Sequence, residues 1–86
     1  MDAKTEIRKF IIDKFYVASP AALSDDASLL DEGIMDSTGV LEVITFIEGS
    51  FGLHVEDEEM LPDNLDSIAR ITAFVARKQS EALRAS

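Results

Sequence analysis

The spacing of apolar residues predicts three main helices. In each segment, apolar side chains recur at steps of three and four residues, which places them along one face of a helix. The first helix is predicted over residues 3–17, the second over 37–51 and the last over 67–79. Their apolar stripes are Ile7, Phe10, Ile11 and Phe15, then Val40, Val43, Ile44, Ile47 and Phe51, then Ile68, Ile71, Phe74 and Val75.

Turn-forming residues separate these helices. The residue before a proline avoids the helical region, so Ser19-Pro20 is expected to end the first helix. A long connection with few strand signals follows over 18–36. Gly52 stands where a left-handed cap would close the second helix. Residues 57–65 are predicted to contain one short helix or turn.

These elements predict an all-α fold. There is no hairpin signal and no alternation of strand and helix, which excludes a parallel sheet. We therefore expect a small antiparallel bundle of three to four helices with a long first loop. With 86 residues, the chain supports a single domain over 1–86.

Charge is distributed unevenly along the chain. Residues 21–66 contain thirteen acidic residues and neither lysine nor arginine, while residues 1–20 and 67–86 carry net charges of +1 and +3. The total is −9. Nucleic acid is a poor partner for such a surface, because phosphate binding needs lysine and arginine. Proteins with basic patches are the expected partners.

Composition limits both the chemistry available to the protein and the compartment expected for it. The sequence has no cysteine, so it forms neither a disulfide nor a thiolate metal site. The segment 1–7 lacks the basic start and apolar run of a secretory signal. No apolar stretch is long enough to span a bilayer. We expect a cytoplasmic, monomeric protein.

The start of the second helix is the candidate functional site. Gly33 allows the chain to turn, and Asp36 can cap the helix by accepting from its unpaired backbone N–H groups. Ser37 then lies in the first turn, beside the positive end of the helix dipole, where a phosphate ester would be tolerated. On its own, an Asp-Ser pair is most simply explained as capping.

The surroundings of this pair form a longer pattern. It consists of the run Leu29-Leu30-Asp31-Glu32-Gly33-Ile34-Met35-Asp36-Ser37, then Val40, Glu42 and Val43, then Ile47, Glu48, Phe51, Gly52, Leu53 and Val55. This pattern resembles the acyl carrier protein family, and the resemblance extends from Ile7 to about Arg77. In that family, the serine after the aspartate carries a phosphopantetheine arm.

The resemblance implies a mechanism without an active site in this chain. A phosphopantetheinyl transferase, using coenzyme A and magnesium, would attach 4′-phosphopantetheine to Ser37, and Asp36 would assist. The thiol of the arm would carry acyl or aminoacyl groups as thioesters, with no catalytic residue and no resident metal. Further implied partners are an acyl- or aminoacyl-loading ligase and a downstream transferase or synthase with a basic docking surface. The implied partner-binding residues are Met35, Val40, Glu42, Val43 and Glu48.

The sequence departs from the housekeeping fatty-acid carriers at three positions of the second helix. By this resemblance, the housekeeping carriers usually have leucine at the position of Thr38, aspartate at that of Gly39 and a second glutamate at that of Gly49. These differences indicate a specialised stand-alone carrier rather than the central fatty-acid carrier.

Other functions find less support. A hydrolase using Ser37 needs a base held against it, but His54, the only histidine, is seventeen positions away and no Gly-x-Ser-x-Gly elbow is present. A calcium loop over 31–42 would place Gly33 and Met35 where oxygen ligands are required. Two alternatives remain: an unmodified acidic helical module that binds a basic partner, and a phosphoserine switch at Ser37.

Helical spacing also assigns some side chains to core or surface. Leu41 and Phe46 lie beside the inward stripe of the second helix and are interpreted as extra core. The alternative is that they contact a partner or line a site for cargo. Arg70, Arg77 and Lys78 are expected to face solvent on the last helix.

Overall fold

Four α-helices and two short 3-10 turns form the described part of the chain. The computed structural model describes residues 2–17 and 19–85, except for the side chains of the last two. No strand occurs within these ranges, so the all-α prediction is confirmed. The elements are α1 (Ala3–Lys14), η1 (Pro20–Ala22), α2 (Ser37–Phe51), η2 (Asp57–Glu59), α3 (Pro62–Leu65) and α4 (Ile68–Ala85).

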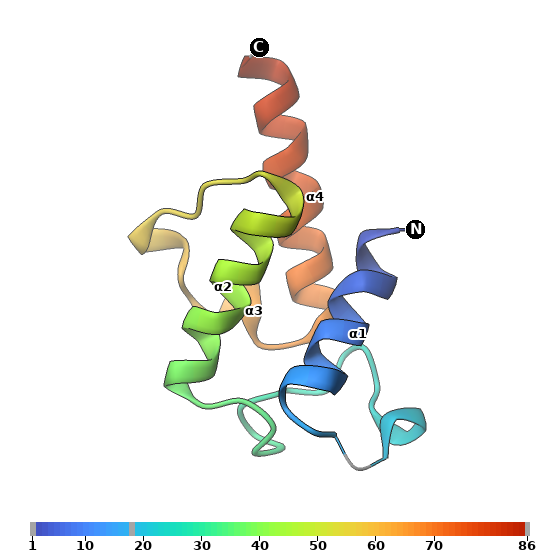
Figure 1. Ribbon diagram of the computed structural model, residues 1–86. Coiled ribbons are helices and arrows are strands. Elements are labelled where there is room, and N and C mark those ends of the chain that lie inside the picture. Colours follow the sequence, from blue (N-terminus) through green and yellow to red (C-terminus); the bar gives the residue numbers. More distant parts are fainter. Residues whose placement is uncertain (1, 18, 86) are drawn as a thin grey trace.

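The three long helices form the body of the fold (Figure 1). α1 runs in the opposite direction to α2 and α4, which point the same way, and the connection between α1 and α2 passes across the lower end of the bundle. The last turns of α4 project beyond the other helices. No described helix is both long and apolar enough to cross a lipid bilayer.

The core combines helix faces with the connecting segments. The predicted stripes supply most of it, and α3 and the loops supply the rest, so the loops are held against the bundle by buried apolar side chains. The buried apolar residues are Ile7, Ile11, Val43, Ile44, Ile47, Ile68, Ile71, Phe74 and Val75 from the long helices, with Leu23, Leu29, Met35, Val55 and Leu65 from the connections and α3.

α1 ends three residues earlier than predicted. It stops at Lys14, and Phe15 follows as the C-cap. Tyr16 then adopts a left-handed conformation with φ 53° and is 90% exposed. Such a conformation costs a non-glycine residue about 1–2 kcal/mol. Because the Phe15 ring packs against the first turn of α2, the chain leaves the helix well before Pro20, and the proline is not the terminator.

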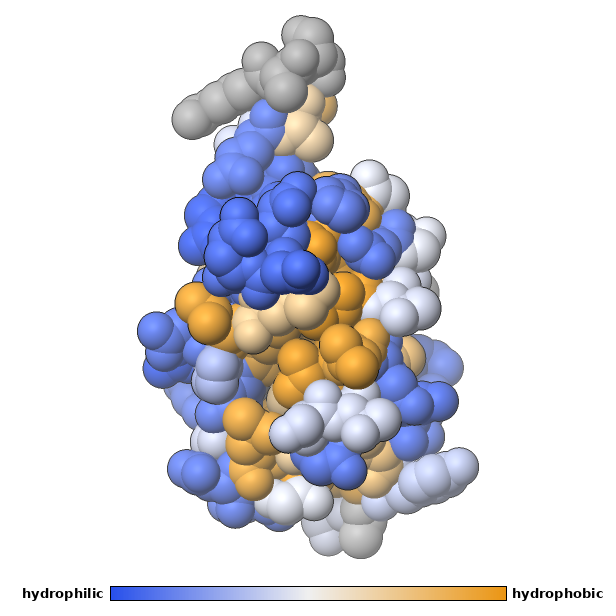
Figure 2. Space-filling view, turned by 90° about the vertical axis from the view of Figure 1, so that its left-hand side faces the viewer, coloured by the Kyte–Doolittle hydropathy of each residue, from blue (hydrophilic) through white to orange (hydrophobic). Residues whose placement is uncertain are grey.

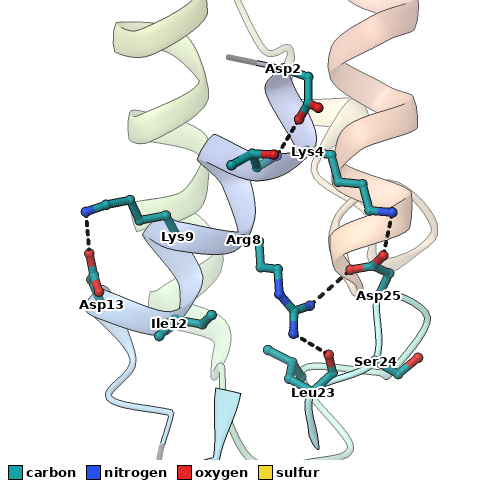
Figure 3. Close-up of a pocket in the computed structure, with 10 residues that line it drawn as sticks. Asp2, Lys4, Arg8, Lys9, Ile12, Asp13, Leu23, Ser24 and Asp25 are labelled. Atoms are coloured by element: carbon teal, nitrogen blue, oxygen red, sulfur yellow. Dashed lines mark hydrogen bonds and ion pairs between the residues drawn. The ribbon is translucent and has the colours of Figure 1, made fainter. Parts of the chain in front are cut away.

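Arg8 holds the first part of the long loop against α1. Its Nη1 atom lies 3.0 Å from Oδ1 of Asp25, and its Nη2 atom donates to the Leu23 carbonyl at 2.7 Å (Figure 3). Nη2 also donates to the Pro20 carbonyl at 2.7 Å. The Asp25 carbonyl in turn accepts the backbone N–H of Ala69 at 2.8 Å. The loop is therefore fixed to both the first and the last helix.

Asp66, between α3 and α4, holds the second part of the same loop. Its Oδ2 atom accepts from the Ser28 hydroxyl at 2.6 Å, and its Oδ1 atom accepts the Leu30 N–H at 2.9 Å. The Asp66 carbonyl also accepts the Leu29 N–H at 2.7 Å. One residue thus makes three hydrogen bonds to the segment that leads into α2.

The segment 57–65, predicted to contain one short helix or turn, contains two elements. η2 and α3 are separated at Met60-Leu61, and Pro62 opens α3, where its missing N–H costs nothing. An ion pair between Lys78 of α4 and Glu59 holds η2 in place. The Lys78 side chain is only 15% exposed, and its Nζ lies 2.9 Å from Oε1 of Glu59, so the prediction that it faces solvent is wrong.

α4 extends six residues beyond its predicted end. The Ser67 hydroxyl accepts the Arg70 N–H at 3.0 Å and caps the start of the helix. No proline or glycine follows 79, so nothing local stops the helix before Ala85. The side chains of Arg70 and Arg77 are exposed, as predicted.

Candidate functional site

Asp36 and Ser37 lie at the start of α2 in the arrangement that the sequence predicts. The Asp36 backbone is extended, with φ −109° and ψ −174°, and its Oδ1 atom accepts the Gly39 N–H at 2.7 Å. Its carbonyl accepts the Val40 N–H at 3.1 Å. Asp36 is therefore the N-cap, and Ser37 is the first helical residue, exposed to solvent.

A closed turn supports the cap from the loop side. Gly33 has φ 72°, a left-handed conformation that glycine adopts without strain. The N–H groups of Ile34 and Met35 both donate to the Leu29 carbonyl, at 3.0 and 3.1 Å. Because Leu29 is buried and bonded to Asp66, this turn fixes the path of the chain into Asp36.

Gly39 allows three segments to meet at the first turn of α2. A Cβ atom at this position would lie 2.8 Å from Cε1 of Phe15 and 2.9 Å from Cγ of Met35. Only glycine lets the ring at the end of α1 and the methionine of the loop lie so close to the helix. Gly39 departs from the family pattern in sequence, and this packing role was not predicted from it. An isolated glycine inside a helical pattern was the available signal.

An apolar cleft of about 300 Å³ opens beside Ser37. It lies between the first turns of α2 and the segment that contains α3, on the face shown in Figure 2, where apolar side chains gather in the middle. Only Ser37 and Asp66 are polar in its lining. The lining residues are Leu30, Met35, Ser37, Val40, Leu41, Met60, Leu61, Pro62, Leu65 and Asp66.

Leu41 and Phe46, which were interpreted as extra core with partner contact as the alternative, differ in their surroundings. Phe46 is half-buried and stacks on Phe10 with ring centroids 4.2 Å apart, so its assignment to the core is close to the observed position. Leu41 is 57% exposed at the edge of the cleft, and its assignment to the core is wrong. The cleft separates Leu41 from the α3 segment, so no core forms beneath it.

The apolar residues implied as partner contacts lie deeper than expected. Met35 is 3% exposed and Val43 is 1% exposed, so both belong to the core and present almost no surface to a partner. We correct the expectation for these two residues. Val40 is half-buried and lines the cleft, where part of its side chain is accessible.

The acidic residues implied as partner contacts also have internal roles. The Glu42 side chain is 43% exposed, and its Oε1 atom lies 3.7 Å from Nζ of Lys14. Glu48 accepts the Val55 N–H at 2.9 Å, and the same oxygen lies 3.6 Å from Nδ1 of His54. Glu48 thus holds the segment after α2, and His54 is exposed on the surface.

The electrostatics around Ser37 favour an added phosphate. The first turn of α2 contains no acidic side chain beyond the cap, so its unpaired N–H groups and the positive end of the dipole remain available. The exposed hydroxyl can accept a phosphate ester, and the adjoining cleft offers apolar surface to a group carried beyond that phosphate. Among the described residues, no group of histidine and acidic side chains is arranged to hold a metal ion.

A second depression lies between α1 and the first loop, and Ser37 does not line it (Figure 3). Several of its charged groups are paired with each other: Nζ of Lys4 lies 2.6 Å from Oδ2 of Asp25. The hydrogen bond from Lys4, with Arg8 also nearby, lowers the pKa of Asp25, and Asp25 raises the pKa of Lys4. These groups stabilise the loop.

Known proteins resemble this chain along most of its length. The D-alanyl carrier protein of Streptococcus mutans is 32% identical over 71 residues, which are 83% of this chain and 87% of the relative. The D-alanyl carrier protein of Abiotrophia defectiva is 32% identical over 53 residues, 62% of this chain and 67% of the relative. That of Streptococcus gordonii is 31% identical over 75 residues, 87% of this chain and 92% of the relative.

The fold has a solved counterpart as well. The apo structure of KstB-PCP matches with a TM-score of 0.73 and 36% sequence identity, covering 92% of this chain and 88% of that chain. No family model matches the sequence. The relatives and the shared fold nevertheless agree with each other and with the resemblance read from the sequence. The chain belongs to the phosphopantetheine-dependent carrier proteins.

Proposed function

We propose that Ser37 is the attachment point of 4′-phosphopantetheine and that the arm carries aminoacyl groups as thioesters. The observation that supports this most directly is the position of Ser37. Its exposed hydroxyl stands at the first residue of α2, behind the Asp36 cap and at the edge of an apolar cleft. Carrier proteins of this family hold their cofactor covalently, so one accessible hydroxyl at a helix start provides the necessary group.

In this proposal the chain positions Ser37 for modification, and the transferase catalyses the reaction. A transferase using coenzyme A and magnesium would form an ester bond between Ser37 Oγ and the phosphate of the arm. The phosphoanhydride bond of coenzyme A would break at the same time, so that 3′,5′-ADP leaves, and the hydroxyl proton of Ser37 would pass to a base of the transferase. The helix start stabilises the resulting negative charge. Asp36 holds the first turn through Oδ1, and its exposed carboxylate is positioned to approach a magnesium ion brought by the transferase. The arm supplies a thiol, which this cysteine-free chain lacks.

Aminoacyl cargo is supported by the relatives. Three of them are named for a D-alanyl group, and the structural neighbour is a PCP. The departures from the housekeeping fatty-acid carriers at Thr38, Gly39 and Gly49 agree with a dedicated role. We therefore expect a loading ligase that activates an amino acid, followed by a transferase or synthase that accepts it. Coenzyme A as the donor places the modification in the cytoplasm.

Intact mass spectrometry tests the attachment site. The chain is incubated with coenzyme A, magnesium and a broad-specificity phosphopantetheinyl transferase. The wild type should gain one phosphopantetheine, and Ser37→Ala should gain none. Ser50→Ala is the matched control, because Ser50 is an exposed serine at the other end of the same helix. No gain on the folded wild type would refute the proposal, and a gain on Ser37→Ala would show that the arm is attached elsewhere.

The cargo needs a separate measurement. The modified protein is offered D-alanine, ATP and an adenylating D-alanine ligase in one reaction, and the central fatty-acid elongation enzymes in another. A mass increase of one D-alanyl group in the first reaction, without elongation in the second, supports aminoacyl cargo. Elongation as efficient as that of a housekeeping carrier would contradict it.

A further inference from the structure

We infer that Asp66 is a positioning residue for the modification of Ser37. Its carboxylate fixes the second part of the first loop, residues 28–35, and through this segment it keeps the Asp36 cap and the first turn of α2 in the form that a modifying enzyme can use. The inference rests on the proposed function, because it names a residue that keeps Ser37 ready for that same reaction.

The Asp66 carboxylate bonds to the loop and not to the helix that follows it. An aspartate just before a helix commonly caps that helix by accepting from the N–H groups of its first turn. Here Ser67 has this role, because its hydroxyl accepts the Arg70 N–H at 3.0 Å. The Oδ2 and Oδ1 atoms of Asp66 instead accept from Ser28 Oγ at 2.6 Å and from the Leu30 N–H at 2.9 Å. Capping of α4 therefore does not account for an aspartate at this position.

Asp66 makes every hydrogen bond that joins residues 28–35 to another segment within the described part of the chain. Besides the two bonds to its side chain, its carbonyl accepts the Leu29 N–H at 2.7 Å. The other hydrogen bonds of residues 28–35 lie within that segment. The buried side chains of Leu29 and Met35 also hold the segment against the core. Apolar packing is non-directional, so the bonds to Asp66 determine the exact placement of the backbone.

The segment transmits this constraint to the start of α2. The Met35 N–H donates to the Leu29 carbonyl at 3.1 Å. Asp36 follows directly, and its Oδ1 atom accepts the Gly39 N–H at 2.7 Å. The first N–H groups of a helix have no partner within the helix, so its first turn depends on the cap. If the segment leaves its position, Asp36 is displaced and the turn that begins with Ser37 frays.

Loosening the segment should change KM and leave kcat unchanged. When only a fraction of a protein has the binding-competent conformation, its apparent affinity for a partner falls by that fraction. A saturating concentration of the chain compensates for this loss, so KM for the chain rises while kcat is retained. A group that acts only in the transition state behaves differently, because its loss lowers kcat.

Two substitutions of Asp66 test the inference with the broad-specificity transferase, coenzyme A and magnesium saturating and the apo chain varied. Alanine removes both side-chain bonds. Asparagine removes the same negative charge but keeps the bonds, because its oxygen can accept the Leu30 N–H and its amide group can donate to Ser28 Oγ. Asp66→Ala should raise KM at least about fivefold, which corresponds to a competent fraction of about one fifth. Asp66→Asn should remain close to wild type.

Val75→Ala is the control for a general loss of stability. Val75 is fully buried in α4 and makes no hydrogen bond to the loop through its side chain, and alanine there leaves a cavity. All variants are compared where circular dichroism shows them to be folded, and Val75→Ala should keep the wild-type KM. If Asp66→Ala does not fold, Ser28→Ala takes its place, with a smaller rise in KM expected, because it removes only one of the two bonds.

Amide hydrogen exchange gives a second measurement that needs no enzyme. In Asp66→Ala, the Met35 and Gly39 amides should exchange at least about tenfold faster than in Val75→Ala, because the loop and the first turn of α2 open locally without unfolding of the whole chain. Asp66→Asn should keep the slower exchange. Equal exchange in Asp66→Ala and Val75→Ala would refute the inference, because the segment would then not depend on Asp66.

The kinetic outcomes separate this inference from the proposed function. If the wild type is not modified, both fail. If the wild type is modified at Ser37 but Asp66→Ala keeps the wild-type KM, only the positioning role is refuted. The same holds if Val75→Ala raises KM equally. It holds also if Asp66→Asn behaves as Asp66→Ala, because the lost charge and not the lost placement would then explain the change.

Discussion

The two glycines of α2 form a natural matched pair for testing the packing around the site. At Gly39, an added Cβ would lie 2.8 Å from the Phe15 ring and 2.9 Å from Met35, both closer than a real Cβ contact. At Gly49, an added Cβ would meet nothing within 4 Å. Alanine at both positions adds the same methyl group to the same helix, so the difference between the variants isolates the contact with the ring.

Two effects of opposite sign determine the expected stabilities. Alanine in a helix interior is more favourable than glycine by about 1 kcal/mol, and Gly49→Ala, in the last turn of α2, should gain part of this. Gly39 is in the first turn, where the gain is smaller, and inserting a methyl group into a packed contact costs about 1–3 kcal/mol. We expect Gly39→Ala to lose about 1 kcal/mol overall, so the two variants shift in opposite directions.

Urea unfolding, followed by far-ultraviolet circular dichroism and analysed by linear extrapolation, measures both changes. Replacing Phe15 by leucine in the Gly39→Ala background should recover part of the loss, because a smaller side chain relieves the contact, and a double-mutant cycle gives the coupling. If Gly39→Ala were stabilised as much as Gly49→Ala, the close approach of the ring would not determine the choice of glycine, and our reasoning would be wrong.

Three further measurements test the supports of the site. Asp36→Ala should lower the free energy of unfolding by about 1 kcal/mol through loss of the cap. An unchanged urea midpoint would contradict the capping role. Gly52→Ala should cost about 1 kcal/mol, because Gly52 has φ 64°, and a stabilised variant would contradict this strain. The backbone N–H of Glu56, and then Lys78, lower the pKa of Glu59 below its ordinary 4.5. Its contribution to stability is therefore complete above pH 4.5 and is lost as the pH falls through the lower, folded-state pKa. The stability difference between wild type and Glu59→Gln should shrink over that range, and a constant difference would refute the assignment.

Features that depend on neighbouring residues could be predicted from the sequence. Helical spacing and the capping residues gave α2 its observed bounds, with Asp36 before it and Gly52 after it. These signals are local, because a cap interacts with backbone groups only a few residues away. The resemblance of this segment to carrier proteins was confirmed by the relatives and the solved structure.

The end of α1 and the depth of the site residues depend on distant contacts instead. α1 stops at Lys14 because Phe15 turns toward α2, and spacing within α1 contains no information about that contact. Met35 proved to be core, and Leu41 proved to be surface. Which flank of α2 faces a cleft depends on where the α3 segment lies, and no periodicity within α2 specifies this.

The polar contacts that hold the first loop and η2 could not be predicted from the sequence either. Asp66 bonds to Ser28 and Leu30, which are 38 and 36 positions away in the sequence. Lys78 reaches Glu59 across 19 positions and becomes largely buried, although helical polarity alone suggested a solvated lysine. Leu61 was not singled out, because a leucine beside a proline in a turn has no distinctive pattern.

The dependence of the first loop on Asp66 and Ala69 has a consequence for biosynthesis. A ribosome adds about 5–20 residues per second, so Ala69 is made roughly 2–6 s after Ser37. During that interval the nascent chain already contains the serine, the capping aspartate and the cleft-lining Leu41. It lacks the hydrogen-bond acceptors and donors that hold 25–30 in place. If Ser37 is modified as proposed, the chain should become a substrate only once Asp66 and Ala69, at the start of α4, have emerged from the ribosome. The order of synthesis would then itself delay modification until the loop can be held in place.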